Sequence, residues 1–130
     1  MLLALIACGG GAGEDQPPAA SGGLQPTLDS IQANIFTPTC AKSSCHTGAG
    51  APEGLRLDAG LSHMNLVNVP VPRDTALTRV IPGMPDASFL IEKLEGTQTI
   101  GAQMPDDGPP YLQAAQIQVI KEWILNGAPQ

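Results

Sequence analysis

The chain has 130 residues, a length that fits one compact domain with tails better than two domains. Hydrophobic residues make up 42% but aromatic residues only 3%, and 15 Gly with 13 Pro predict a loop-rich domain whose centre is filled by something besides side chains. Twelve acidic against six basic residues give a formal charge of −6, which disfavours nucleic acids and anionic lipid head groups as partners and favours a basic protein surface.

The first seven residues form an apolar run that is too short to span a bilayer and ends at a small residue before Cys8. The run Leu5–Cys8 (LIAC) resembles the bacterial lipobox, in which a signal is cleaved off and the cysteine becomes the lipidated first residue. We therefore expect residues 1–7 to be the end of a lipoprotein signal segment. Cys8 would then anchor an exported protein to a membrane, in the periplasm or at the cell surface. The alternative is a buried N-terminal strand, which the glycines after Cys8 disfavour.

Residues 8–26 are rich in Pro, Gly, Ser and acidic residues, a composition typical of a flexible linker. We expect the folded domain to span residues 27–130. Its first helix is predicted over residues 28–35, where apolar residues recur at helical spacing. Thr27 is suited to cap this helix, and Pro38 is expected to end it.

Two further helices are predicted nearer the C-terminus. The second runs through residues 89–94, with Asp86 or Ser88 as its cap and Gly96 as its end. The third spans Leu112–Asn126, where four apolar residues fall on one face. Three short helices joined by long loops predict a mainly α domain.

Two cysteines and a histidine stand close together in residues 39–47 (TCAKSSCHT). Cys40 and Cys45 are separated by four residues, and His46 follows directly. A close cysteine pair followed by histidine is typical of covalent haem attachment, usually as C-x-x-C-H, and a four-residue spacer is a known variant. Two thiols can add across the two vinyl groups of one porphyrin edge, and the adjacent imidazole can bind the iron.

Three other interpretations of these residues remain open. A Cys40–Cys45 disulfide suits an exported protein, but its short loop stabilises little and leaves His46 without a role. A zinc site of two cysteines and two histidines would need His63 as its fourth ligand and lacks a familiar finger spacing. A copper site built from Cys, His and Met would use one thiolate and leave the second without a function.

The order of these features resembles that of small class I cytochromes c. In that family an N-terminal helix precedes the attachment motif, a methionine in a later loop supplies the distal ligand, and a C-terminal helix packs across the first. Here the run Gly101–Pro105 (GAQMP) places Met104 before a proline, ahead of the last expected helix. Residues 80–83 (VIPG) and 123–128 (WILNGA) also resemble a bacterial subgroup of exported cytochromes with expanded attachment spacing. The resemblance covers nearly all of residues 27–130.

Four residues compete as the distal ligand that the resemblance implies. Met104 is expected, because a Gly-, Pro- and Asp-rich loop between two helices can fold over one face of a haem. His63 is the runner-up, since imidazole binds iron in both oxidation states; otherwise it is a solvated loop histidine. Met64 is its neighbour, and Met84 lies in a tight turn where a surface position is expected.

The resemblance implies a cytochrome c-like fold of three or more short helices with long loops around one covalently bound haem c. Cys40 and Cys45 would hold the haem, with His46 as proximal and Met104 as distal iron ligand. Because protein occupies both axial positions, we expect an electron carrier rather than an enzyme, or the haem subunit of a larger oxidoreductase. Its partners would be redox proteins with basic patches. The alternative function is a non-haem exported lipoprotein with a Cys40–Cys45 disulfide, acting as a binding or scaffolding subunit.

A haem would also explain the composition, because a porphyrin supplies a large flat apolar body to a domain with few aromatic residues. Its binding free energy would become folding free energy, so the chain without it is expected to be unfolded or molten. The residues expected to line such a group or to join the core beside it are Leu55, Leu57, Leu66, Val80, Leu90, Leu94 and Trp123.

Overall fold

The computed structural model describes residues 23–130. The predicted signal segment 1–7, the lipidation site Cys8 and residues 9–22 of the predicted linker lie outside this range. Leu24 falls within the predicted 8–26 linker, yet its side chain is only 4% exposed and belongs to the hydrophobic core. In the described part of the chain, no helix has the length and apolar character needed to cross a membrane.

The described residues combine helices with one small antiparallel sheet. The elements are α1 (Leu28–Ile31), α2 (Ser62–Leu66), β1 (Pro70–Val71), β2 (Asp74–Thr78), α3 (Phe89–Glu95) and α4 (Ala114–Leu125). The fold is therefore mixed, and the expected mainly α class is confirmed only in that helices carry most of the regular structure. The hairpin was not predicted, because β1 has two residues and β2 is largely exposed, so neither shows an alternating pattern.

The first helix begins as expected, with the Thr27 hydroxyl accepting a hydrogen bond from the Ser30 amide at 3.3 Å. The prediction that Pro38 ends the helix is wrong. The chain continues from Gln32 to Cys40 in wider turns, in which amides bond to carbonyls five residues earlier, as Ala41 does to Phe36 at 2.7 Å. Proline donates no amide hydrogen, and the wider turn carries the preceding carbonyls away from its ring. Cys40 therefore lies at the end of a helical segment.

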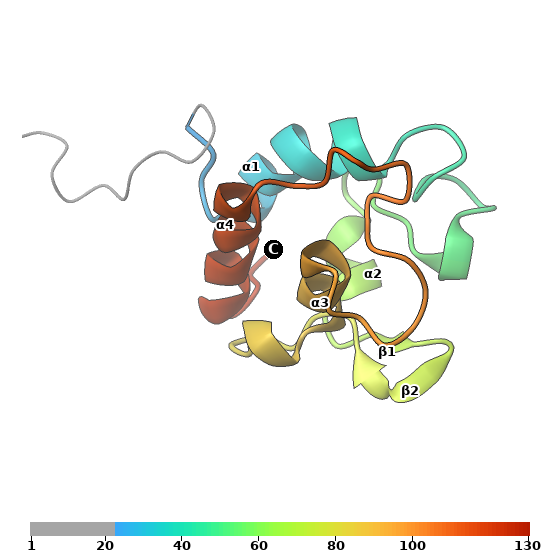
Figure 1. The fold of residues 1–130 in the computed structure, drawn as a ribbon. Helices are drawn as coiled ribbons and strands as arrows, with labels where there is room; N and C mark the ends of the chain where they lie inside the picture. The colour runs from blue at the N-terminus through green and yellow to red at the C-terminus, as the bar shows by residue number, and fades with distance from the viewer. Residues whose placement is uncertain (1–22) are drawn as a thin grey trace, which may run out of the picture.

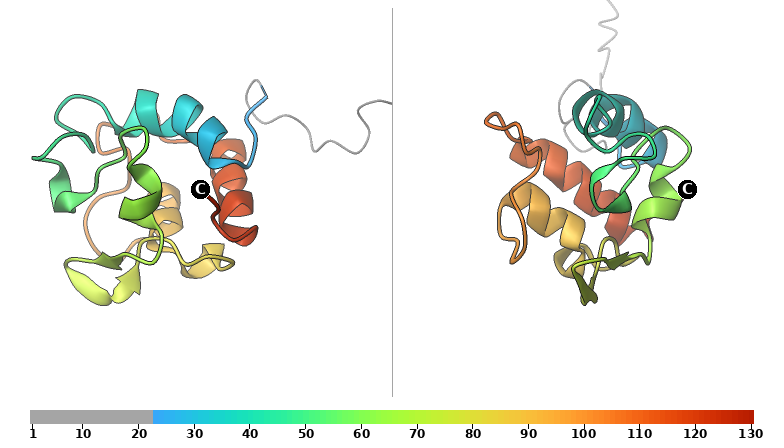
Figure 2. Two further views of the ribbon diagram at one scale, coloured as in Figure 1. Left: turned by 180° about the vertical axis from the view of Figure 1, so that it is seen from behind. Right: turned by 90° about the vertical axis from the view of Figure 1, so that its right-hand side faces the viewer.

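The two later helices lie close to their predicted positions. α3 ends at Gly96, whose φ of 80° is the left-handed conformation that glycine adopts most readily. α4 begins at Ala114 rather than at Leu112, because the Gln113 amide is satisfied by the Gln116 side chain at 2.9 Å. The chain between α3 and α4 folds back along the outside of α3 (orange in Figure 1 and in the right-hand view of Figure 2).

The core forms where α4 packs against α1 and α3 (Figure 1). Ile31 of α1 and Ile120, Trp123 and Ile124 of α4 are fully buried there. The long segments 41–61 and 97–112 contain little regular structure but pack in or against this core through Leu55, Leu57, Met104 and Leu112. Loops therefore complete the domain beside the packed helices.

The packing of α4 is tested by replacing a buried residue of the helix and, as a control, an exposed residue of the same helix. Ile120→Ala should lower the free energy of unfolding by about 2–5 kcal/mol, because it removes apolar contacts and leaves a cavity. Leu125→Ala is the matched control, since Leu125 is 62% exposed, and it should change the free energy by less than about 0.5 kcal/mol. Urea unfolding followed by far-ultraviolet circular dichroism measures both. Equal losses would contradict the packing of α4.

Candidate functional site

A cavity of about 260 Å³ lies beside the helical core, enclosed by α2, the hairpin, α3 and the loop that follows α3. This volume is close to the roughly 300 Å³ at which small-molecule sites begin. Five of the seven residues expected to line it do so. Its apolar walls are formed by Leu55, Leu57, Leu66, Val71, Phe89, Leu90, Leu94 and Ile100.

The cysteine loop closes on itself beside this cavity. The His46 amide donates to the Cys40 carbonyl at 2.9 Å, and the Cys45 amide donates to the Lys42 carbonyl at 2.9 Å. Cys40 and His46 consequently both line the cavity, whereas Cys45 is half-buried in the turn. Both cysteines are free thiols in the structure rather than the disulfide of the alternative interpretation. Burial, and next the neighbouring Cys45, raise the pKa of Cys40 to about 12, so at neutral pH it is a protonated thiol.

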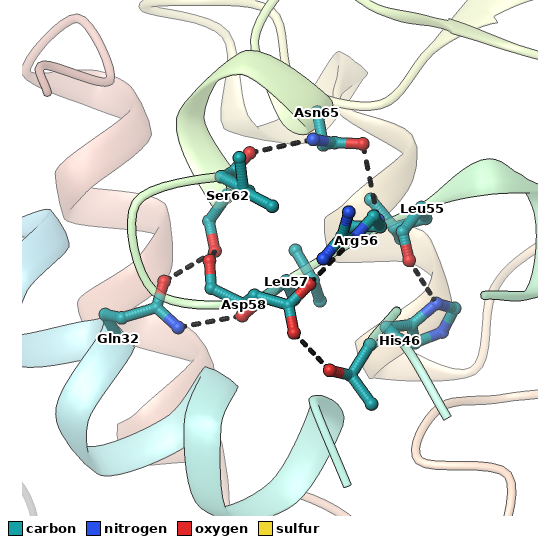
Figure 3. A network of polar contacts seen from close by, with 10 residues as sticks. Gln32, His46, Leu55, Arg56, Leu57, Asp58, Ser62 and Asn65 are labelled. Atoms are coloured by element: carbon teal, nitrogen blue, oxygen red, sulfur yellow. Dashed lines mark hydrogen bonds and ion pairs between the residues drawn. The ribbon is translucent and has the colours of Figure 1, made fainter. Parts of the chain in front are cut away.

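The His46 ring is fixed by the carbonyl of Leu55, which lies 3.1 Å from Nδ1 (Figure 3). A carbonyl oxygen only accepts hydrogen bonds, so Nδ1 carries the proton and Nε2 keeps its lone pair. Burial lowers the pKa of His46, the bond to Leu55 opposes this, and the nearby cations Arg79 and Lys93 lower it further. The result is a neutral imidazole with one nitrogen available to a metal.

A network of polar contacts holds the segment that carries the Leu55 carbonyl (Figure 3). The Arg56 amide donates to the Asn65 side chain at 3.3 Å, which ties the segment to α2. The Gln32 side chain donates to the Leu57 carbonyl at 2.8 Å, which ties it to the first helical segment. The acceptor of the His46 hydrogen bond is therefore held from two elements.

Met104 reaches the same cavity from the loop between α3 and α4. Its amide donates to the Lys93 carbonyl at 2.8 Å, and its side chain is half-buried against the core. The cavity thus brings Cys40, His46 and Met104 together, although 63 residues lie between Cys40 and Met104 in the sequence.

Charged residues that sequence reasoning did not assign to the site also line the cavity. Arg79 is only 8% exposed and donates to the main-chain carbonyls of Asn65 at 2.9 Å and Glu53 at 2.6 Å. Arg73 is an exposed neighbour paired with the Glu53 carboxylate at 2.8 Å. Lys93 lines the cavity from α3. The available signal was weak: Arg79 and Lys93 are single basic residues beside apolar ones, a pattern that surface residues also produce.

Several candidate residues lie away from the cavity. The runner-up ligand His63 is on α2, and its Nε2 lies 3.0 Å from the Ala128 carbonyl, near the C-terminal end of α4. Met64 and Met84 are exposed. The Cys₂His₂ set considered for zinc is not assembled, and among residues 23–130 no group of three or more His, Cys, Asp or Glu side chains is placed to hold a metal ion. Val80 and Trp123, also expected at the site, are fully buried in the core instead.

The arrangement is an apolar cavity that offers two kinds of soft or borderline metal ligand and one thiol for covalent attachment. The imidazole of His46 and the thioether of Met104 both reach it, and Cys40 lies at its edge. Imidazole and thioether groups are both ligands that transition metals accept. Comparisons with protein-family models, with curated proteins and with solved structures find no match for this chain.

Arg79 and Arg73 allow the effect of a buried polar contact on stability to be compared with that of a surface contact. Arg79→Leu removes hydrogen bonds from a buried guanidinium to two main-chain carbonyls, each about 1.5–3 kcal/mol, and should lower the free energy of unfolding by several kcal/mol. Arg73→Leu breaks an exposed ion pair with Glu53 and should cost less than about 1 kcal/mol. Urea unfolding of both variants measures the difference. A cost for Arg73→Leu as large as that for Arg79→Leu would show that burial of Arg79 is not what matters.

Proposed function

We propose that this chain is an electron carrier that holds one haem c covalently through Cys40 and Cys45, with His46 and Met104 as axial iron ligands. The single observation that supports it most is the pairing of two features at one apolar cavity. His46 is a neutral imidazole whose Nδ1 proton is bound by Leu55, and Met104 lines the same cavity. A histidine that binds a metal through one ring nitrogen ordinarily donates a hydrogen bond from the other ring nitrogen to a carbonyl, a carboxylate or water.

The remaining residues of the site fit the same group. Cys40 is a free thiol at the cavity edge, and addition of its sulfur and hydrogen across a vinyl group would form a thioether. Cys45 is held in the same turn by its amide. Arg73, Arg79 and Lys93 supply positive charge at the cavity, beside the carboxylates of Glu53 and Asp106, and could donate hydrogen bonds to the two carboxylates of a porphyrin.

Haem iron supplies a one-electron redox centre when bound. His46 and Met104 would fill its two axial positions, which leaves none for a substrate and favours electron transfer over catalysis. The thioether of Met104 favours the reduced state more than a second imidazole would. The proposed carrier is therefore not an enzyme by itself, although it could serve as the haem subunit of one.

The proposal includes a cytochrome c-like arrangement of the helices. The packing of α4 against α1, with the cysteine loop directly after the first helical segment, supports it. We also propose export and anchoring through a lipid on Cys8, which would keep the carrier near membrane-bound redox partners. A formal charge of −6 supports partners with basic docking patches.

Covalent haem is tested by producing the full chain in a host with haem c maturation machinery and recording the pyridine haemochrome spectrum and intact mass. We expect a c-type spectrum and a mass increase of one haem per chain. Both should be lost in the variant with Cys40→Ser and Cys45→Ser, because no thioether can form. A wild-type chain that is two protons lighter than the reduced chain and carries no haem would instead establish the disulfide and overturn the proposal.

Axial ligation by Met104 is tested on the haem-loaded protein. Met104→Ala should keep covalent haem but lose the near-infrared charge-transfer band that Met-ligated ferric cytochromes of the resembled family show. His63→Ala is the control and should keep the band, because His63 lies away from the cavity and contacts Ala128. Loss of the band in His63→Ala with retention in Met104→Ala would reverse the assignment.

A further inference from the structure

The loop that carries Met104 is bound to α3 mainly through one residue, Lys93. The Lys93 ammonium donates to the Ala102 carbonyl at 2.7 Å and to the Ile100 carbonyl at 3.3 Å. The main-chain carbonyl of Lys93 accepts the Met104 amide at 2.8 Å. Lys93 therefore contacts the loop with both its side chain and its backbone, at Ile100, Ala102 and Met104.

The backbone of the loop is fitted closely around this ammonium. Gly101 stands between the two acceptor carbonyls with a φ of 73°, and a Cβ there would lie 2.7 Å from the Lys93 Nζ. Any other residue at this position would be strained and would push the ammonium away. Glycine therefore suits position 101 both for its backbone conformation and for the close approach of the Lys93 ammonium.

A second contact fixes the start of the same loop. The Gln103 side chain donates to the Leu94 carbonyl at 3.1 Å and lies over Gly96, where a Cβ would be 2.8 Å from Gln103 Oε1. The segment from the end of α3 to Met104 is consequently packed onto α3 along its length. Among the described residues, no carboxylate lies within ion-pair distance of Lys93, so main-chain carbonyls are its hydrogen-bond partners.

We infer that Lys93 is a positioning residue that holds Met104 at the cavity, and this inference rests on the proposed function. A thioether is a weak ligand, so its binding depends on the loop being ordered before the bond forms. Hydrogen bonds from a cation to carbonyls in a partly desolvated place are stronger than neutral ones. Lys93 thereby keeps the loop ordered, with Met104 at the cavity.

A second lysine reaches the same loop and provides a matched control. Lys42, in the cysteine loop, pairs with Asp107 at 3.2 Å, but the two side chains are 46% and 63% exposed. An exposed ion pair of this kind contributes little. Comparison of Lys93 with Lys42 therefore separates positioning of Met104 from a general effect of removing a positive charge near the loop.

The test uses the haem-loaded full chain with Lys93→Met, which keeps a long side chain and removes the ammonium. The ferric near-infrared band should be weakened or lost while covalent haem is retained. The affinity of the ferric protein for added imidazole, which competes for the distal position, should rise roughly tenfold, because the bonds lost are charge-assisted. Lys42→Met should keep the wild-type band and affinity. An unchanged band in Lys93→Met, with imidazole affinity within about twofold of wild type, would overturn the inference.

A second variant covers the case in which Lys93→Met does not fold. Gly101→Ala keeps the lysine but displaces its ammonium, and we expect the same loss of the band and the same rise in imidazole affinity. A normal band in Gly101→Ala would overturn the inference as well. These outcomes are distinct from failure of the proposed function: a wild-type chain without covalent haem refutes both, whereas haem-loaded variants with a normal band refute only the role of Lys93.

Discussion

Side chains donate hydrogen bonds to main-chain carbonyls of the loops around the cavity, in addition to the main-chain hydrogen bonds of those loops. His46 and Gln32 donate to the segment that carries Leu55 and Leu57, Arg79 donates to Asn65 of α2, and Lys93 donates to the loop after α3. Unpaired carbonyls in a partly buried place would be costly. These side-chain hydrogen bonds therefore help to hold the loops that line the cavity in place.

The helical half of the domain was accessible from sequence because its signals are local. Apolar spacing predicted α3 and α4 to within two residues, and Gly96 ends α3 as expected, although Ser88 at the N-cap makes no side-chain cap hydrogen bond. Pro38 was misread because the rule that proline ends a helix assumes the ordinary helical turn, and the chain widens its turn instead. The hairpin was missed because its strands are short and exposed, so their pairing depends on the turn between them rather than on a pattern.

The site was accessible only where its chemistry has a sequence pattern. The cysteine pair with His46 is recognisable from the sequence without any knowledge of the fold. Met104 was predicted through the resemblance to cytochromes c. The positions of Arg79 and Lys93 at the cavity could not be predicted, because both bind main-chain carbonyls. Every residue has a main-chain carbonyl, so such a contact leaves no pattern in a single sequence. The choice between His63 and Met104 likewise depended on which loop reaches the cavity, a property of the whole fold.

The cavity links the folding of this chain to its occupant. An unfilled apolar cavity lowers the stability of a domain, because the apolar residues that line it lack packing partners there. An occupant that fills the space recovers this free energy. Chains that have not yet acquired it would open often enough for proteases to cut them. The cellular lifetime of the chain would then depend on whether the cavity is filled.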